Sequence, residues 1–430
     1  MRRFVNALIV LLAGFAWLGT RYIWKFGSIA GWPTEFGTLG VFATELLAFE
    51  IAALTAIEAW HRRAALFKNG AVPASLALLA LAYASAAWSL DVSYALLSGD
   101  RILLGIGVMI AMIVWRPSRA AVLGALVFGA AVNSLLGVGQ FLTQSVGSSL
   151  WFGIAGHLPS ELGAFVVETA DARWLRAYGA LAHPNILGLL AAVGILAIVG
   201  LLRQSKRRGQ RAALLGLTAI LAAGLAVSVS RGAVLSLLVG LCAIGAALFA
   251  SNARIEAKLL LRSAAIVAIV IALFAGFFPD VFLTRISASG RLERQSIDDR
   301  LWSYHDARTL IAASPLVGVG VGQMPGVVQA VNGGGRHPSQ FQPAHNEALL
   351  VAAELGLLGL IAWLLLRIRI IAALLKAIRA GGEEKILNAA ILGIIAALLT
   401  AGLVDHFLWT SWFGQLLFWL TAGLALSTED

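Results

Sequence analysis

The sequence predicts an all-α integral membrane protein with one long polar loop. Of its 430 residues, 60% are hydrophobic and only 13% are charged, whereas a soluble domain carries about 25% charged residues. Apolar runs of bilayer-spanning length recur along the chain, which excludes a soluble enzyme and predicts about 12 transmembrane helices. The expected spans lie near 4–24, 36–58, 71–90, 95–115, 119–143, 181–202, 212–229, 232–250, 263–283, 346–370, 386–405 and 407–427.

Basic residues set the expected orientation of these spans. Twenty of the 32 Lys and Arg residues fall in short connections on one side, and such an excess marks the cytoplasmic side. Both termini are then cytoplasmic, and the two longest loops face outward. Topology also accounts for the net charge of +10, so no nucleic-acid partner is expected. The expected organisation is N-terminal transmembrane helices at 1–143, an outer loop at 144–180, transmembrane core helices at 181–283, a long outer loop at 284–345 and C-terminal transmembrane helices at 346–430.

A histidine at the end of the long outer loop is the first candidate for chemistry. His345 stands where the loop meets the tenth span, and a titratable side chain at a membrane boundary is costly without a function or a partner. Eleven residues, about three helical turns, separate it from Gly356, so the two share a face on which Gly356 and Gly359 allow another helix to approach. His345 is either a general base, oriented by Asn346 and Glu347, or a structural histidine at a helix start.

Arginines on the same side are candidate anion-binding groups. Arg231 lies in a tight outer turn beside a helix N-terminus, a position that suits a phosphate, although its side chain can equally extend to the lipid headgroups. Arg300 belongs to an amphipathic helical stretch at 299–308 and can equally be part of a solvated face. Weaker candidates in this loop are Arg291, Arg294, Arg336 and His337.

The outer start of the sixth span carries a third polar segment. Arg176, His183 and Asn185 occur there, either as ligands for a substrate or as a helix cap. Across the chain, no set of three carboxylates or histidines resembles a metal site. The outer side is therefore expected to bind a pyrophosphate without a metal ion or a cofactor.

Four short motifs occur in order between residues 176 and 360. They are Arg176, Gly179, His183, Pro184 and Asn185; Ser230, Arg231 and Gly232; Arg300, Trp302, Pro315, Leu316, Gly318 and Gly320; and His345, Asn346, Gly356 and Gly359. This ordered set resembles the O-antigen ligase and polymerase superfamily of bacterial glycosyltransferases. The first 140 residues resemble the family only in hydropathy and in the number of spans.

The resemblance implies a membrane glycosyltransferase with a GT-C-like fold. It implies transfer of a glycan from undecaprenyl pyrophosphate to the lipid A–core oligosaccharide, at the periplasmic face of the bacterial inner membrane, with inversion and without a metal. His345 is then the general base, while Arg231 and Arg300 stabilise the pyrophosphate leaving group. The residues expected to contact substrate are Arg176, His183, Asn185, Arg291, Arg294, Arg336, His337, Asn346 and Glu347.

Three other functions remain open from the sequence. An O-antigen polymerase uses the same donor but joins one repeat unit to another, and a protein O-oligosaccharyltransferase belongs to the same superfamily. A twelve-span transporter is the alternative from another class. Such carriers usually consist of two similar halves with functional charges at the midplane. Here the long loop follows the ninth span and faces outward, and no half-to-half repeat is visible.

Overall fold

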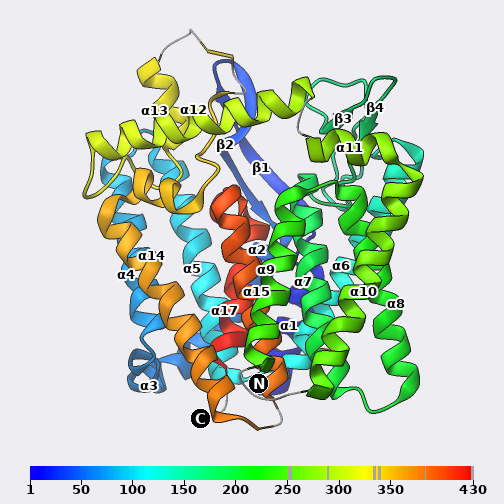
Figure 1. Ribbon diagram of the computed structural model, residues 1–430. Helices are drawn as coiled ribbons and strands as arrows, with labels where there is room; N and C mark the ends of the chain where they lie inside the picture. Colours follow the sequence, from blue (N-terminus) through cyan, green and yellow to red (C-terminus); the bar gives the residue numbers. More distant parts are fainter. Residues whose placement is uncertain (250–253, 288–289, 333–335, 338–339, 383, 428–430) are drawn as a thin grey trace.

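The computed structural model describes residues 1–249, 254–287, 290–332, 336–337, 340–382 and 384–427, most of which are helical (Figure 1). Among these residues, nine helical segments are long and apolar enough to cross a membrane, which indicates a multi-pass membrane protein. Their helices are α4 (Ala71–Ser85) with η1 (Ala86–Trp88), α5 (Val92–Trp115), α6 (Arg119–Thr143), α7 (Pro184–Gln204), α8 (Arg208–Ser228), α9 (Arg231–Phe249), α10 (Arg254–Phe277), α14 (Glu347–Ala380) and α15 (Lys385–Val404). Other helices of the bundle are α1 (Arg2–Phe15), α2 (Ala43–His61), α3 (Arg63–Lys68), α16 (Phe407–Thr410) and α17 (Trp412–Leu426).

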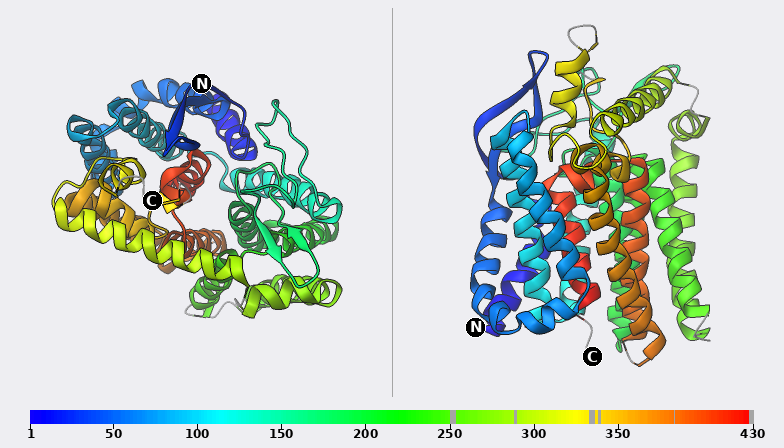
Figure 2. Two further views of the ribbon diagram at one scale, coloured as in Figure 1. Left: turned by 90° about the horizontal axis from the view of Figure 1, so that it is seen from above. Right: turned by 90° about the vertical axis from the view of Figure 1, so that its left-hand side faces the viewer.

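The first two expected spans are corrected by a β-hairpin. The strands β1 (Arg21–Ile29) and β2 (Trp32–Phe42) pair antiparallel, so α1 ends earlier and α2 begins later than the apolar runs suggested. The chain reverses at Ala30 and Gly31, both with positive φ (50° and 80°), as a two-residue hairpin turn requires. This hairpin rises beyond the ends of the neighbouring bundle helices (Figures 1 and 2).

A second small ribbon lies in the loop expected at 144–180. The strands β3 (Val166–Glu168) and β4 (Arg173–Leu175) pair antiparallel over three residues each. The described chain is mostly helical, as predicted, and the two small ribbons are features that the prediction did not contain.

Three helices cover one end of the bundle. The helices α11 (Pro279–Ser287), α12 (Arg291–Ala313) and α13 (Met324–Asn332) lie at the end opposite to the two chain termini (Figure 1). The expected amphipathic helix at 299–308 is confirmed, because it forms the middle of α12. Ser303, Ala307 and Leu310 are buried on its inner side, whereas His305 and Arg308 are exposed.

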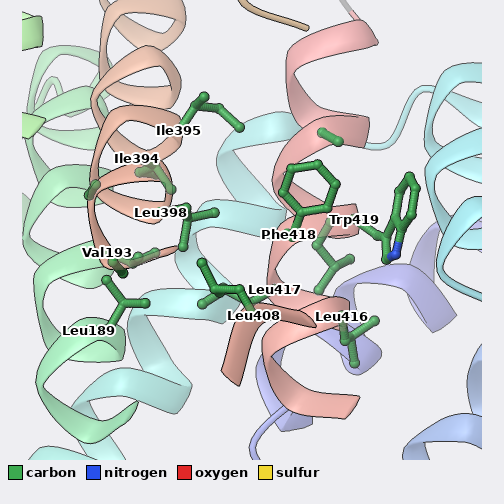
Figure 3. Packing of buried hydrophobic residues seen from close by; sticks show 14 of the residues in the cluster. Leu189, Val193, Ile394, Ile395, Leu398, Leu408, Leu416, Leu417, Phe418 and Trp419 are labelled. Atoms are coloured by element: carbon green, nitrogen blue, oxygen red, sulfur yellow. The ribbon is translucent and has the colours of Figure 1, made fainter. Parts of the chain in front are cut away.

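The helices α7 and α15 form the centre of the bundle. Inside the protein lie 89% of the α7 span and 78% of the α15 span, against 17% for α10, which is peripheral. Figure 3 shows Leu189 and Val193 of α7 near Ile394 and Leu398 of α15, with Phe418 of α17 close by. Side chains at the outer ends of these two helices are therefore held by a densely packed core.

The helix α14 is interrupted at Gly356, which has φ 65° and ψ −167°. The turn at 315–320 packs against this interruption: Leu357 N–H donates to the Pro315 carbonyl (2.8 Å), and Gly320 N–H donates to the Glu354 carbonyl (2.8 Å). A Cβ on Gly356 would lie 2.2 Å from the backbone of Leu316. The expectation of one continuous helical face from His345 to Gly356 is wrong, because α14 begins at Glu347 and a turn, rather than another helix, makes the close approach.

Candidate active site

His345 lies between the outer helices and the bundle, just before α14. Its backbone is held by α12: its N–H donates to Ser303 Oγ (3.4 Å), and the Tyr304 hydroxyl donates to its carbonyl oxygen (3.0 Å). The side chain is largely buried, with 18% exposed. The position of this imidazole therefore depends on how α12 sits on the bundle.

Asp405 and His406 directly follow the end of α15. That end of the helix lies beside His345. His345 Nδ1 is 3.7 Å from Asp405 Oδ1, which is close enough for an ion pair but longer than a hydrogen bond. The rings of His345 and His406 have centroids 4.9 Å apart. Burial by itself raises the pKa of Asp405, but contact with His345 and the charges of the two histidines hold it well below the usual range. The ionised carboxylate can stabilise positive charge on His345.

A polar chain connects Asp405 to the start of α7. Asn185 Nδ2 donates to Asp405 Oδ2 (2.9 Å), and Asn185 Oδ1 accepts from an Arg176 guanidinium nitrogen (2.7 Å). His183 caps α7 by accepting the Asn185 N–H at Nδ1 (2.9 Å). Burial, reinforced by the charge of Arg176, lowers the pKa of His183 to about 3, so this ring is neutral. The structure thus places Arg176, His183 and Asn185 in the same cluster as His345.

Four arginines, namely Arg176, Arg231, Arg285 and Arg300, interact on this outer side. Burial first, and then the charges of Arg285 and Arg300, lower the pKa of Arg176 well below its usual value. Burial and Arg231 likewise lower the pKa of Arg285, although Arg285 pairs with Glu293 at 3.2 Å. Arg300 Nε is buried and has no hydrogen-bond partner among the described residues. An anionic group at this cluster would relieve the mutual repulsion and accept these donors.

Arg231 occupies the first turn of α9, as its place after the outer turn predicted. Its guanidinium donates to the backbone carbonyl of Arg285 (3.2 Å). Arg285 in turn donates from Nε to the carbonyl oxygen of Val229 (3.1 Å). These reciprocal bonds fasten α11 to the start of α9 and hold both guanidinium groups at the cluster.

Two of the loop candidates point away from this cluster. Arg291 is exposed and pairs with Glu168 of β3 at 2.9 Å. Arg294, one turn further along α12, is exposed to solvent. Both lie at the end of α12 that faces the β3–β4 ribbon (Figure 1), so neither is brought to His345.

The other two loop candidates lie beyond the far end of α13. Arg336 pairs with Asp306 at 2.7 Å, and its guanidinium lies 5.0 Å from the centre of the Trp302 ring. The His337 ring is near Trp32 at the start of β2, with centroids 6.2 Å apart. These contacts tie the loop to α12 and to the hairpin.

Asn346 and Glu347 are engaged with groups other than His345. Asn346 caps α14 by accepting the Leu349 N–H (3.0 Å). Glu347 is buried and pairs with Arg367 further along the same helix, while accepting a hydrogen bond from Trp363 Nε1 (3.0 Å). The expectation that this pair orients the histidine is therefore wrong, and Asp405 stands in that place.

Asp405 and His406 were not among the site residues predicted from the sequence. They fall between two apolar runs with no loop between them, and two adjacent ionisable residues at such a boundary were the available signal. The structure also brings two histidines and a carboxylate together, a grouping that the sequence did not indicate. His345, Asp405 and His406 place one ligand atom each within 4.8 Å of one another.

Comparison with known proteins gives one family match. Residues 216–364 match the family model described as O-antigen ligase. The matched segment contains Arg231, Arg300 and His345 but ends before Asp405 and begins after Arg176. No curated protein matches the chain.

Proposed function

Because the chain belongs to the O-antigen ligase and polymerase superfamily, we propose that it is a lipopolysaccharide O-antigen ligase with a GT-C-like fold. It transfers a glycan from undecaprenyl pyrophosphate to the lipid A–core oligosaccharide, at the periplasmic face of the bacterial inner membrane. The observation that carries the proposal is a largely buried histidine–carboxylate pair next to a cluster of four arginines, one of which, Arg285, pairs with Glu293.

His345 is the proposed general base. It accepts the proton of an acceptor hydroxyl while that oxygen attacks the anomeric carbon of the donor sugar, a role worth about 10²–10⁴ in rate. The bond from that carbon to the pyrophosphate oxygen breaks, so the configuration inverts. Asp405, 3.7 Å away, stabilises the imidazolium that forms.

The arginine cluster is the proposed site for the pyrophosphate. Arg300 offers an Nε donor with no partner among the described residues, and Arg176 is buried beside Asn185. Guanidinium groups bind phosphate oxygens through paired hydrogen bonds and gain strength as charge develops on the leaving group. Arg231 completes this group through its bond to the Arg285 backbone.

The test is transfer of a lipid-linked glycan by purified protein with rough lipopolysaccharide as acceptor. His345→Ala is expected to lower transfer about 10²–10⁴-fold, and Arg231→Ala to lower it as well. His305→Ala is the matched control, because His305 lies on the exposed side of α12. Transfer at the wild-type rate by both site variants would refute the assignment.

A second acceptor separates ligase from polymerase. The same donor is offered with rough lipopolysaccharide in one reaction and with a second lipid-linked glycan in the other. A ligase gives product only in the first reaction, whereas elongation of the lipid-linked glycan in the second would identify a polymerase.

A further inference from the structure

The group formed by His345, Asp405 and His406 has a ligand set suited to a transition-metal ion. The three side chains come from the segment before α14 and the segment after α15, and one ligand atom of each lies within 4.8 Å of the others. Two imidazoles and one carboxylate that leave a further position open are a common set for Zn²⁺. Asn185, which bonds both Asp405 and Arg176, joins this group to the arginine cluster.

The separation of His345 and Asp405 fits an ion better than a shared proton. Their nearest atoms, Nδ1 and Oδ1, are 3.7 Å apart, whereas an N–H···O hydrogen bond spans about 2.7–3.2 Å. Two atoms bound tetrahedrally to one ion at about 2.0–2.2 Å lie roughly 3.4 Å apart. His345 Nδ1 is also buried without a hydrogen-bond partner among the described residues.

The neighbours of His406 and Asp405 leave the required lone pairs available. The Thr410 hydroxyl oxygen lies 2.9 Å from His406 Nδ1 and 3.3 Å from the His406 carbonyl oxygen, and we assign the hydroxyl proton to the carbonyl, so that Nδ1–H donates to the hydroxyl. This assignment leaves Nε2 of the neutral ring as the nitrogen with the lone pair. Asn185 holds the other carboxylate oxygen of Asp405 (2.9 Å). Supporting bonds of this kind are what orient metal ligands in proteins.

We propose that Zn²⁺ binds reversibly to His345, Asp405 and His406 and switches the site off. An imidazole that binds a metal through Nδ1 keeps its proton on Nε2, so it cannot accept a second proton from a substrate. Metal binding and the action of His345 as a base therefore exclude each other. Arg176 is linked to Asp405 through Asn185, and its positive charge opposes a cation at the group, which favours reversible binding. Only the inhibitory part of this inference rests on the proposed function.

The binding experiment uses the full-length protein in detergent after removal of metal by a chelator. Zn²⁺ is titrated calorimetrically, and Co²⁺ is added separately, because its visible absorption reports tetrahedral nitrogen and oxygen coordination. One ion per chain is expected. His406→Ala and His406→Gln should each weaken binding about tenfold or more, while His305→Ala, at an exposed histidine, should bind as the wild type does.

Zn²⁺ binding and inhibition by Zn²⁺ are measured in separate experiments. Zn²⁺ should abolish glycan transfer, the chelator should restore it, and the concentration that halves transfer should match the calorimetric affinity. Equal affinity in the His406 variants and in the His305 control, or full transfer by protein with Zn²⁺ bound, would overturn the proposal. Because Zn²⁺ and Co²⁺ binding are measured without substrates, they stand even if the chain transfers no glycan.

Discussion

The side chain of His345 acquires its proposed chemistry from Asp405. Its neighbours in sequence contact other groups: Asn346 caps α14, and Glu347 pairs with Arg367. The carboxylate reaches it from the far end of α15, and that end is fixed by the central packing of α7 and α15. The base and its partner are therefore positioned by two different helices.

Asp405→Asn should lower kcat without a comparable change in the KM for the donor. The amide keeps the shape and can still accept from Asn185, but it loses the negative charge that stabilises the imidazolium of His345. We expect a loss of about 10²-fold or more in kcat. Steady-state transfer kinetics measure it, with Asp280→Asn on the exposed side of α11 as the control. A change in KM alone would assign Asp405 to substrate binding instead.

Arg300→Lys should weaken donor use while keeping the positive charge. A lysine has no planar fork and cannot reproduce the paired hydrogen bonds of a guanidinium to phosphate oxygens. We expect kcat/KM for the lipid-linked donor to fall about tenfold or more. Arg308→Lys, on the exposed side of the same helix, is the matched control. Equal kinetics for the two variants would show that Arg300 does not contact the pyrophosphate.

At the scale of elements, the interruption of α14 brings together two of the four sequence motifs. The turn at 315–320 packs on the backbone at Gly356, through bonds from Val319 to Ala353 (3.0 Å) and from Leu357 to Pro315 (2.8 Å). Since α12 leads into this turn and also holds the backbone of His345, the glycine indirectly sets the position of the histidine. This connection gives both motifs a structural reason to occur together.

Gly356→Ala should destabilise the protein. The residue has φ 65°, and the new methyl carbon would lie 2.2 Å from the Leu316 backbone. The unfavourable φ alone costs about 1–3 kcal/mol, and displacement of the turn adds to it. Thermal unfolding in detergent measures the loss as a lower Tm. Gly124→Ala in α6 is the control, because nothing lies within 4 Å of its Cβ position. Equal Tm values for the two variants would mean that the turn can move without cost.

At the scale of the whole molecule, hydropathy predicted where helices lie better than where they begin and end. Every expected span contains a helix, yet residues 21–42 form a hairpin. Hydropathy did not predict it, because a hydropathy scale cannot distinguish an apolar strand from an apolar helix. The motifs predicted that Arg176, Asn185 and His345 lie on the same side, and the structure connects them through Asp405. Asp405 was not predictable from them, since only the packing of α15 brings it there from 60 residues beyond His345.

The buried ion pair between Glu347 and Arg367 of α14 affects packing across the molecule, because Arg367 also contacts α17. Both side chains are buried, and the Arg367 guanidinium lies 3.5 Å from the Trp363 ring centre and 4.7 Å from that of Phe418 in α17. Breaking a buried pair leaves one charge without compensation. We therefore expect this pair to contribute to stability.

Glu347→Gln should lower the free energy of unfolding by about 3–5 kcal/mol, since it leaves the Arg367 charge buried without a carboxylate. Adding Arg367→Met should restore much of the loss, because the thioether keeps contact with Trp363 and Phe418 without a charge. Glu58→Gln is the control: it breaks a partly exposed pair with Arg62, worth about 0.3–0.5 kcal/mol. Denaturation in detergent measures all three. If the double variant were less stable than Glu347→Gln, the guanidinium would be stabilised by the two rings rather than by the carboxylate.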